Sequence, residues 1–244
     1  MAELLTVKRL CKNGILREIS FGVRAGEMVA VMGPSGSGKS TLLYQASGMD
    51  RADSGEVWMD GTEICGLSED ERAKLRLSQM GFVFQQMNML KNLNLLENIL
   101  LPAWQLHRGK AARRELGRRA RMLMGKMGIE SLAERRITEV SGGQLQRACI
   151  CRSMMNQPKI LFADEPTGAL NQSAAREVMT EFTRLNREGA TILMVTHDSK
   201  VAAQCGRILY LLDGCIRGEF SPAGVAGEKD REEAVGRWLA DMGW

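Results

Sequence analysis

The stretch GPSGSGKST, residues 33–41, determines how the rest of this sequence is interpreted. It matches the pattern G-x-x-x-x-G-K-[S/T]. Before it stands MVAVMG (28–33), a continuously apolar run typical of a strand that is covered on both faces. After it, a helix is expected around residues 39–48. A glycine-rich turn between a buried strand and a helix predicts a phosphate-binding loop.

The residue types in this loop explain how phosphate would be held. Backbone N–H groups approach phosphate oxygens closely where side chains are absent, and the start of the helix adds unpaired donors and a positive dipole end. Lys39 supplies a point charge for the β- and γ-phosphates, and the Ser40 hydroxyl a ligand for magnesium. The predicted phosphate-binding residues are Gly33, Pro34, Ser35, Gly36, Ser37, Gly38, Lys39, Ser40 and Thr41.

Two adjacent acids end a second apolar run, KILFADE at 159–165. A magnesium ion that bridges two phosphates needs a carboxylate at the carboxyl end of a neighbouring strand, and Asp164 is placed for that. Glu165 is the candidate to accept a proton from an attacking water. Taken alone, the run could be a strand that meets a helix cap. Together with the phosphate loop, it predicts a hydrolytic site.

A third motif, VSGGQLQR at 140–147, places two glycines before a helix. Ser141 and Gln144 have the spacing of a capping box, and one interpretation is a well-capped helix and nothing more. A serine hydroxyl, two glycine N–H groups and a helix N-terminus also form an anion site. On the second interpretation, one chain carries two half-sites for phosphate.

With these motifs, the sequence resembles an ATP-binding subunit of an ABC transporter over about residues 4–220. The resemblance implies that ATP and Mg²⁺ are the cofactors. It also implies that two identical copies sandwich two ATP molecules head to tail. The γ-phosphate on one chain would then be contacted by four residues of the other chain, Ser141, Gly142, Gly143 and Gln144.

The resemblance also assigns two further residues. Gln85, in GFVFQQ, fits the family's glutamine loop, which touches magnesium and the attacking water and reports to the membrane subunit. His197, in MVTHD, fits the switch histidine that hydrogen-bonds the γ-phosphate. The expected catalytic residues are Glu165, His197 and Gln85. The expected metal-site residues are Ser40, Gln85 and Asp164.

Two positions depart from the family pattern. The family usually stacks an aromatic ring on adenine from an N-terminal strand, yet residues 1–20 contain no aromatic and Gly14 stands at the expected place. Selectivity for ATP over GTP is therefore less secure than phosphate binding. Asn171 stands where an Asp is common; it keeps a carbonyl acceptor and loses the charge. If this residue contacts the other chain of the dimer by a hydrogen bond alone, Asn could make the same contact as Asp.

The fold class expected is α/β: a P-loop NTPase with a mostly parallel sheet, an N-terminal antiparallel β subdomain and an inserted helical subdomain. Residues 1–244 would form a single ABC ATPase domain. Within it, 1–85 and 158–220 would form the nucleotide-binding core, 86–157 the helical subdomain with the signature motif, and 221–244 a C-terminal helix.

The strings ADEPTGAL (163–170) and LLENILLP (95–102) resemble an exporter-like branch that includes macrolide-efflux, lipoprotein-releasing and bacitracin-resistance ATPases. The alternative is a cell-division-type ABC ATPase that signals through a membrane partner without transport. An ABC ATPase acting on DNA or ribosomes would need a coiled-coil insertion or a second cassette, which this sequence lacks. A P-loop kinase would not explain the signature and switch motifs.

The expected partners are an integral membrane permease and a second copy of the chain. Met80, Met87, Met89 and Leu90, next to Gln85, would suit either an apolar socket for the permease or ordinary core.

No nucleic-acid partner is expected, because a net charge of +4 is mild and the basic helix at 108–128 carries an apolar face. With no leader and no apolar run of membrane-spanning length, the expected location is cytoplasmic, peripheral on the inner face of the membrane through the permease.

Overall fold

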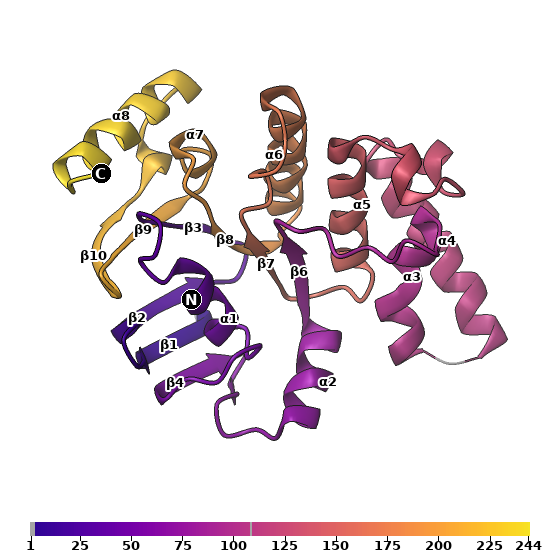
Figure 1. Ribbon diagram of the computed structural model, residues 1–244, viewed down its shortest axis with the longest axis horizontal. Coiled ribbons are helices and arrows are strands. Elements are labelled where there is room, and N and C mark those ends of the chain that lie inside the picture. Colours follow the sequence, from indigo (N-terminus) through magenta and orange to yellow (C-terminus); the bar gives the residue numbers. More distant parts are fainter. Residues whose placement is uncertain (1–2, 108) are drawn as a thin grey trace.

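A computed structural model describes residues 3–107 and 109–244 of the chain. Its centre is a six-stranded sheet in the order β10-β9-β3-β8-β7-β6 (Figure 1). The strands from β9 to β6 are parallel, and β10 runs antiparallel to β9. The strands of this sheet are β3 (Met28–Met32), β6 (Met80–Phe84), β7 (Ile160–Asp164), β8 (Thr191–Val195), β9 (Arg207–Leu212) and β10 (Cys215–Phe220). The prediction of a mostly parallel sheet is confirmed.

Strand β3 shows why its sequence is apolar throughout. All five of its residues are buried. Val29 and Val31 belong to one hydrophobic cluster, whereas Met28, Ala30 and Met32 belong to another. Alternate side chains of a strand point to opposite faces, so β3 contributes to a core on each side of the sheet. The strand that leads into the phosphate loop is therefore fixed on both faces.

The first of these two cores is closed by an antiparallel sheet in the order β2-β1-β4-β5. Its strands are β1 (Glu3–Lys12), β2 (Leu16–Arg24), β4 (Ser54–Met59) and β5 (Thr62–Glu63). Asp60 and Gly61 join the last two with φ angles of 47° and 78°, the conformation of the tight hairpin turn that the Asp-Gly pair predicts. Helix α1 (Lys39–Ala46) contributes Leu42, Leu43 and Ala46 to the same core.

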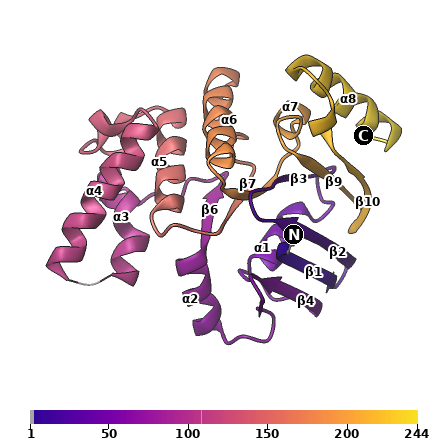
Figure 2. The same cartoon turned by 180° about the vertical axis from the view of Figure 1, so that it is seen from behind.

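The middle of the chain is helical, and it lies to one side of the sheet in both views (Figures 1 and 2). It contains α3 (Leu95–Leu106), α4 (Lys110–Lys126) and α5 (Gly142–Met154), with short 3-10 helices at Glu130–Leu132 and Ile137–Glu139. Helix α2 (Glu69–Gln79) precedes β6. Helical structure was expected from about residue 86, but residues 85–94 form a loop that the Asn98 side chain ties down through Leu90.

Helix α4 has the amphipathic arrangement expected of the basic segment. Leu116, Ala120, Leu123 and Met127 are buried on its inner side. Several outer basic side chains form ion pairs: Arg118 with Glu115, Arg121 with Glu134 and Lys126 with Glu188. Exposed pairs of this kind contribute little stability, so the outer face is a solvated one.

The last part of the chain extends from the helical middle to the other end of the sheet (Figure 1). Helix α6 (Gln172–Arg187) lies between β7 and β8 in sequence, followed by α7 (Ser199–Ala202), a 3-10 helix at Pro222–Gly224, and α8 (Glu228–Asp241). The C-terminal helix packs on the sheet through its apolar side: Val235 and Leu239 are buried, and Trp238 stacks on Phe220. Among residues 3–107 and 109–244, no helix combines the length and apolar composition needed to cross a bilayer.

Candidate active site

The phosphate loop has the backbone conformation that its glycines predict. A Cβ on Gly33 would overlap the carbonyl oxygen of Leu211, so no larger residue fits there. Gly36 and Gly38 have φ angles of 81° and 101°, which side chains disfavour. Among the residues that the structure describes, no further side chain or backbone atom lies within 4 Å of the position where a Gly36 Cβ would be, so this backbone is open to a phosphate group.

Lys39 is held at the centre of the loop. Its Nζ donates hydrogen bonds to the carbonyl oxygens of Gly33 at 2.7 Å and Pro34 at 2.9 Å. Burial lowers the pKa of its ammonium group, and the charges of Glu165 and Asp164 oppose that effect. The nearby Ser37 Oγ is buried and has no hydrogen-bond partner in the described part of the chain. An ammonium group and an unpaired hydroxyl beside an open backbone suit an anionic ligand.

Asp164, at the end of β7, lies against α1. Its Oδ1 accepts a hydrogen bond from Ser40 Oγ at 2.9 Å, and its Oδ2 accepts one from Tyr44 Oη at 2.6 Å. Burial, followed by this contact with Asp164, raises the pKa of Tyr44 to about 12. Ser40 and Asp164 were predicted to share one metal site, and the structure brings them into contact. Tyr44 was missed, because nothing in its local sequence indicates which side chain it faces.

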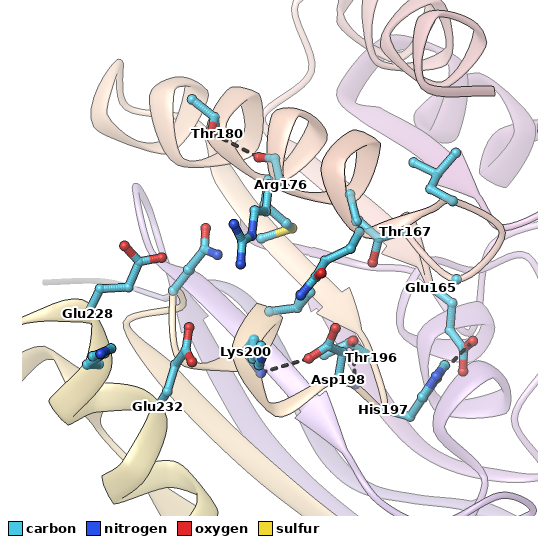
Figure 3. A pocket seen from close by; sticks show the side chains of 18 residues that line it. Glu165, Thr167, Arg176, Thr180, Thr196, His197, Asp198, Lys200, Glu228 and Glu232 are labelled. Carbon is cyan, nitrogen blue, oxygen red and sulfur yellow. Dashed lines mark hydrogen bonds and ion pairs between the residues drawn. The ribbon is translucent and has the colours of Figure 1, made fainter. Parts of the chain in front are cut away.

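Glu165 and His197 come together at the neighbouring strand ends. His197 Nδ1 lies 3.1 Å from Glu165 Oε2 (Figure 3). A Cβ on Gly168 would lie 3.1 Å from both Gln85 Nε2 and Glu165 Oε2, so these two side chains converge on that glycine. Glu165 has a φ of 46°, in the left-handed region, and its N–H donates to Val195 O at 3.0 Å. Three side chains far apart in the sequence therefore meet at one edge of the sheet.

The Glu165 and His197 pair opens onto a cleft of about 890 Å³. The cleft runs from this pair along α6, past Arg176, to Glu228 and Glu232 of α8 (Figure 3). The His197 side chain is 61% exposed, whereas that of Glu165 is 22% exposed. The histidine is thus the accessible member of the pair.

The motif around Ser141 forms the start of α5. Ser141 Oγ accepts from the Gln144 N–H at 3.3 Å, and the Ser141 N–H donates to Gln144 Oε1 at 2.9 Å, which is the predicted capping box. Ser141 and Gly142 are exposed. Gly143 is buried, and its Cβ would lie 2.9 Å from Ala174 Cβ, so this glycine serves the packing of α5 on α6.

The start of α5 does not lie near the phosphate loop of its own chain. Figures 1 and 2 both show α5 well away from α1, which follows the loop. The two segments that the sequence predicts to bind phosphate therefore lie apart within one chain.

Asn171 caps helix α6. Its Oδ1 accepts a hydrogen bond from the Ala174 N–H at 2.9 Å, in the N-cap geometry. The Asn171 side chain thus stabilises a helix of its own chain. The sequence had suggested only a contact across the dimer for this residue.

We predict that Asn171→Ala lowers the free energy of unfolding by about 1 kcal/mol, because the cap is lost. Asn171→Asp is the matched control and should leave the unfolding free energy within about 0.5 kcal/mol, since Asp caps equally well and suits the helix dipole. Urea unfolding of the three proteins measures this. Equal stability of Asn171→Ala and the native chain would contradict the cap.

At the turn where the family usually carries an aromatic ring, this chain has an aliphatic side chain. Gly14 has a φ of 73° in the turn between β1 and β2. The next residue, Ile15, is 40% exposed, and its Cγ2 would lie 3.1 Å from a Cβ on Gly38. An exposed apolar group therefore borders the phosphate loop.

Comparison with known proteins decides the family. The sequence model described as ABC transporter matches residues 16–168. The chain belongs to the ABC transporter family. It is an ATP-binding and ATP-hydrolysing cassette, as its motifs predicted.

Two curated ABC proteins and one solved ABC structure are similar. The ABC transporter ATP-binding protein YxdL of Bacillus subtilis (strain 168) is 43% identical over 228 residues, covering 90% of this chain and 88% of YxdL. The macrolide export ATP-binding/permease protein MacB of Escherichia coli is 41% identical over 221 residues, covering 88% of this chain. The match spans 34% of the length of MacB.

A dimeric structure of the ATP-binding cassette MJ0796, in a post-hydrolysis state bound to ADP and Pi, is 36% identical. It matches with a TM-score of 0.79 and covers 91% of this chain and 100% of that one. The chain is thus an ATP-binding subunit of the transporter type that these ABC proteins represent.

Proposed function

We propose that this ABC cassette hydrolyses Mg²⁺-ATP in a homodimer and thereby drives an exporter-like transporter. Its work would be peptide-antibiotic resistance, macrolide efflux or lipoprotein release. The observation that carries the proposal is the meeting of Ser40, Asp164, Glu165, His197 and Gln85 at the carboxyl ends of adjacent parallel strands. Ligands of open α/β sheets bind at this edge.

The residues present fit a magnesium ion, because a carboxylate, a hydroxyl and an amide oxygen are the ligands this ion prefers. Ser40, Asp164 and Gln85 would hold it. When bound, Mg²⁺ neutralises charge on the phosphate oxygens. Lys39 would then leave the Gly33 and Pro34 carbonyls for the β- and γ-phosphates, and the backbone of residues 33–41 would surround the same groups.

In this proposal, Glu165 removes a proton from the attacking water as the water oxygen bonds to the γ-phosphorus. The bond from that phosphorus to the bridging oxygen breaks, giving ADP and inorganic phosphate. His197 lies 3.1 Å from Glu165 and is mostly exposed, and in this proposal it would hydrogen-bond both the base and the γ-phosphate. Gln85, converging on the same glycine as Glu165, would orient the water.

The separation of α5 from α1 supports a second copy as the partner. Ser141, Gly142 and the helix N-terminus behind them would meet the γ-phosphate held by the other chain, together with Gly143 and Gln144. ATP would complete the contact between chains, and hydrolysis would remove the group that both chains hold.

A groove beside Gln85 supports a permease as the second partner. It has a volume of about 650 Å³ and lies between α2, β6, α3 and α5. Leu77, Phe82 and Phe84 line it, and Phe84 directly precedes Gln85. An apolar groove joined to a catalytic residue suits a short amphipathic helix of the membrane subunit.

The proposed groove differs from the socket that the sequence suggested. Met80 lines the groove, but Met87 and Met89 pack against the core. Leu90 is 48% exposed and is not part of the groove lining. Arg152 of α5 donates to the carbonyl oxygens of Met87 at 2.8 Å and Asn88 at 2.9 Å, which fixes this segment against α5.

We predict that Leu77→Asp lowers co-purification with the membrane permease that the native chain captures at least about tenfold. A carboxylate left unpaired in an apolar contact costs more than about 1.4 kcal/mol. ATP hydrolysis by the isolated chain should remain. Met122→Asp is the control, because Met122 is 52% exposed on α4 and lies outside the groove. Undiminished capture of the permease by Leu77→Asp would rule out the groove as the docking site.

A further inference from the structure

Tyr44 and Ser40 are one helical turn apart on the same face of α1, and both donate to Asp164. The serine hydroxyl binds Oδ1 at 2.9 Å and the phenol binds Oδ2 at 2.6 Å. One helix thereby holds both oxygens of the carboxylate. A carboxylate with a single partner can turn about its Cβ–Cγ bond, whereas one held at both oxygens cannot do so without breaking a hydrogen bond.

The phenol is itself held in place by aromatic packing. The ring of Tyr44 lies 6.5 Å from that of Phe84, at an interplanar angle of 58°. Phe84 stacks on Phe82 at 5.9 Å, and Phe82 stacks on Phe162 of β7 at 5.5 Å. Aromatic contacts of this kind are stabilising and directional. The Tyr44 hydroxyl therefore has a fixed position relative to the end of β7.

We propose that Tyr44 is a positioning residue that orients Asp164 toward the divalent cation. The inference rests on the proposed function, in which Asp164 serves the metal. Groups that hydrogen-bond a ligating carboxylate fix its direction, and removing them typically weakens metal binding 10- to 100-fold. Phe82 and Phe84 also line the groove proposed for the permease. The packed rings of Phe82, Phe84 and Tyr44 therefore connect that groove to the carboxylate of Asp164.

The test is Tyr44→Phe, which removes the hydroxyl and keeps the ring. Mn²⁺ serves as the probe, titrated by electron paramagnetic resonance against the whole chain with a non-hydrolysable ATP analogue. We expect the Mn²⁺ affinity of the variant to fall about tenfold. Binding of the same analogue in EDTA should be unchanged, because Lys39 and the loop backbone are intact.

Tyr210→Phe is the matched control. Tyr210 is a buried tyrosine of β9 that packs on Trp238, and its variant should bind Mn²⁺ like the native chain. Mn²⁺ affinity within twofold of native for Tyr44→Phe would overturn the proposal. So would an equal loss of analogue binding in EDTA, which would mean general damage to the site. If the native chain itself bound no Mn²⁺ with the analogue, the metal assignment in the proposed function would fail first.

Discussion

Lys39→Ala is expected to abolish ATP binding, with a loss of at least about 100-fold in affinity. The ammonium group is the positive side chain at the centre of the loop, and charge-assisted hydrogen bonds contribute about 1.5–3 kcal/mol each. Two such contacts to phosphate oxygens account for a change of this size. Isothermal titration with ATP measures it directly.

Lys91→Ala is a suitable control, because Lys91 is exposed and lies outside the site. It removes the same charge and should bind ATP like the native chain. An affinity for ATP within threefold of native in Lys39→Ala would show that the loop backbone suffices, and that the lysine has another role.

Glu165→Gln should bind ATP normally but hydrolyse it about 10²- to 10⁴-fold more slowly, the usual contribution of a positioned base. The amide keeps the size of the side chain and cannot take up a proton at neutral pH. Because the γ-phosphate then persists, the two chains should stay together as a dimer with ATP. Phosphate release and size-exclusion chromatography measure the two effects.

Glu233→Gln, an exposed position on α8, is the isosteric control and should hydrolyse ATP at the native rate. Normal steady-state hydrolysis by Glu165→Gln would remove Glu165 from the role of base. A variant that hydrolyses ATP slowly but never forms a stable dimer would support Glu165 as the base. It would contradict the proposed homodimer with ATP between its chains.

The parts of the site that sequence predicted are those that depend on local pattern. The phosphate loop requires glycines whose spacing is visible in the sequence, and the capping box of Ser141 and Gln144 spans four consecutive residues. Asp164 and Glu165 end a buried strand, and parallel strands end at one edge of a sheet. Gln85 and His197 came from the family resemblance, because a single polar residue after a strand carries no local signal.

The parts that sequence did not predict depend on packing between distant segments. Tyr44 contacts Asp164 across 120 positions of the chain. Ile15 borders Gly38 because the β1–β2 turn folds over the loop. The loop at 85–94 is held by Asn98, whose amide reaches back along the chain. The division of the chain into core, helical and C-terminal parts stays a prediction.

The two-sided burial of β3 makes the phosphate loop intolerant of insertions and deletions in the preceding strand. Removing one residue between Met28 and Met32 would exchange the side chains that enter the two cores, placing methionines where valines now pack. It would also draw the loop back by about 3.3 Å, more than the length of a hydrogen bond. The position of Lys39 therefore depends on the exact number of residues in β3. Insertions or deletions of single residues can be accommodated more readily in the turns at the opposite end of the sheet.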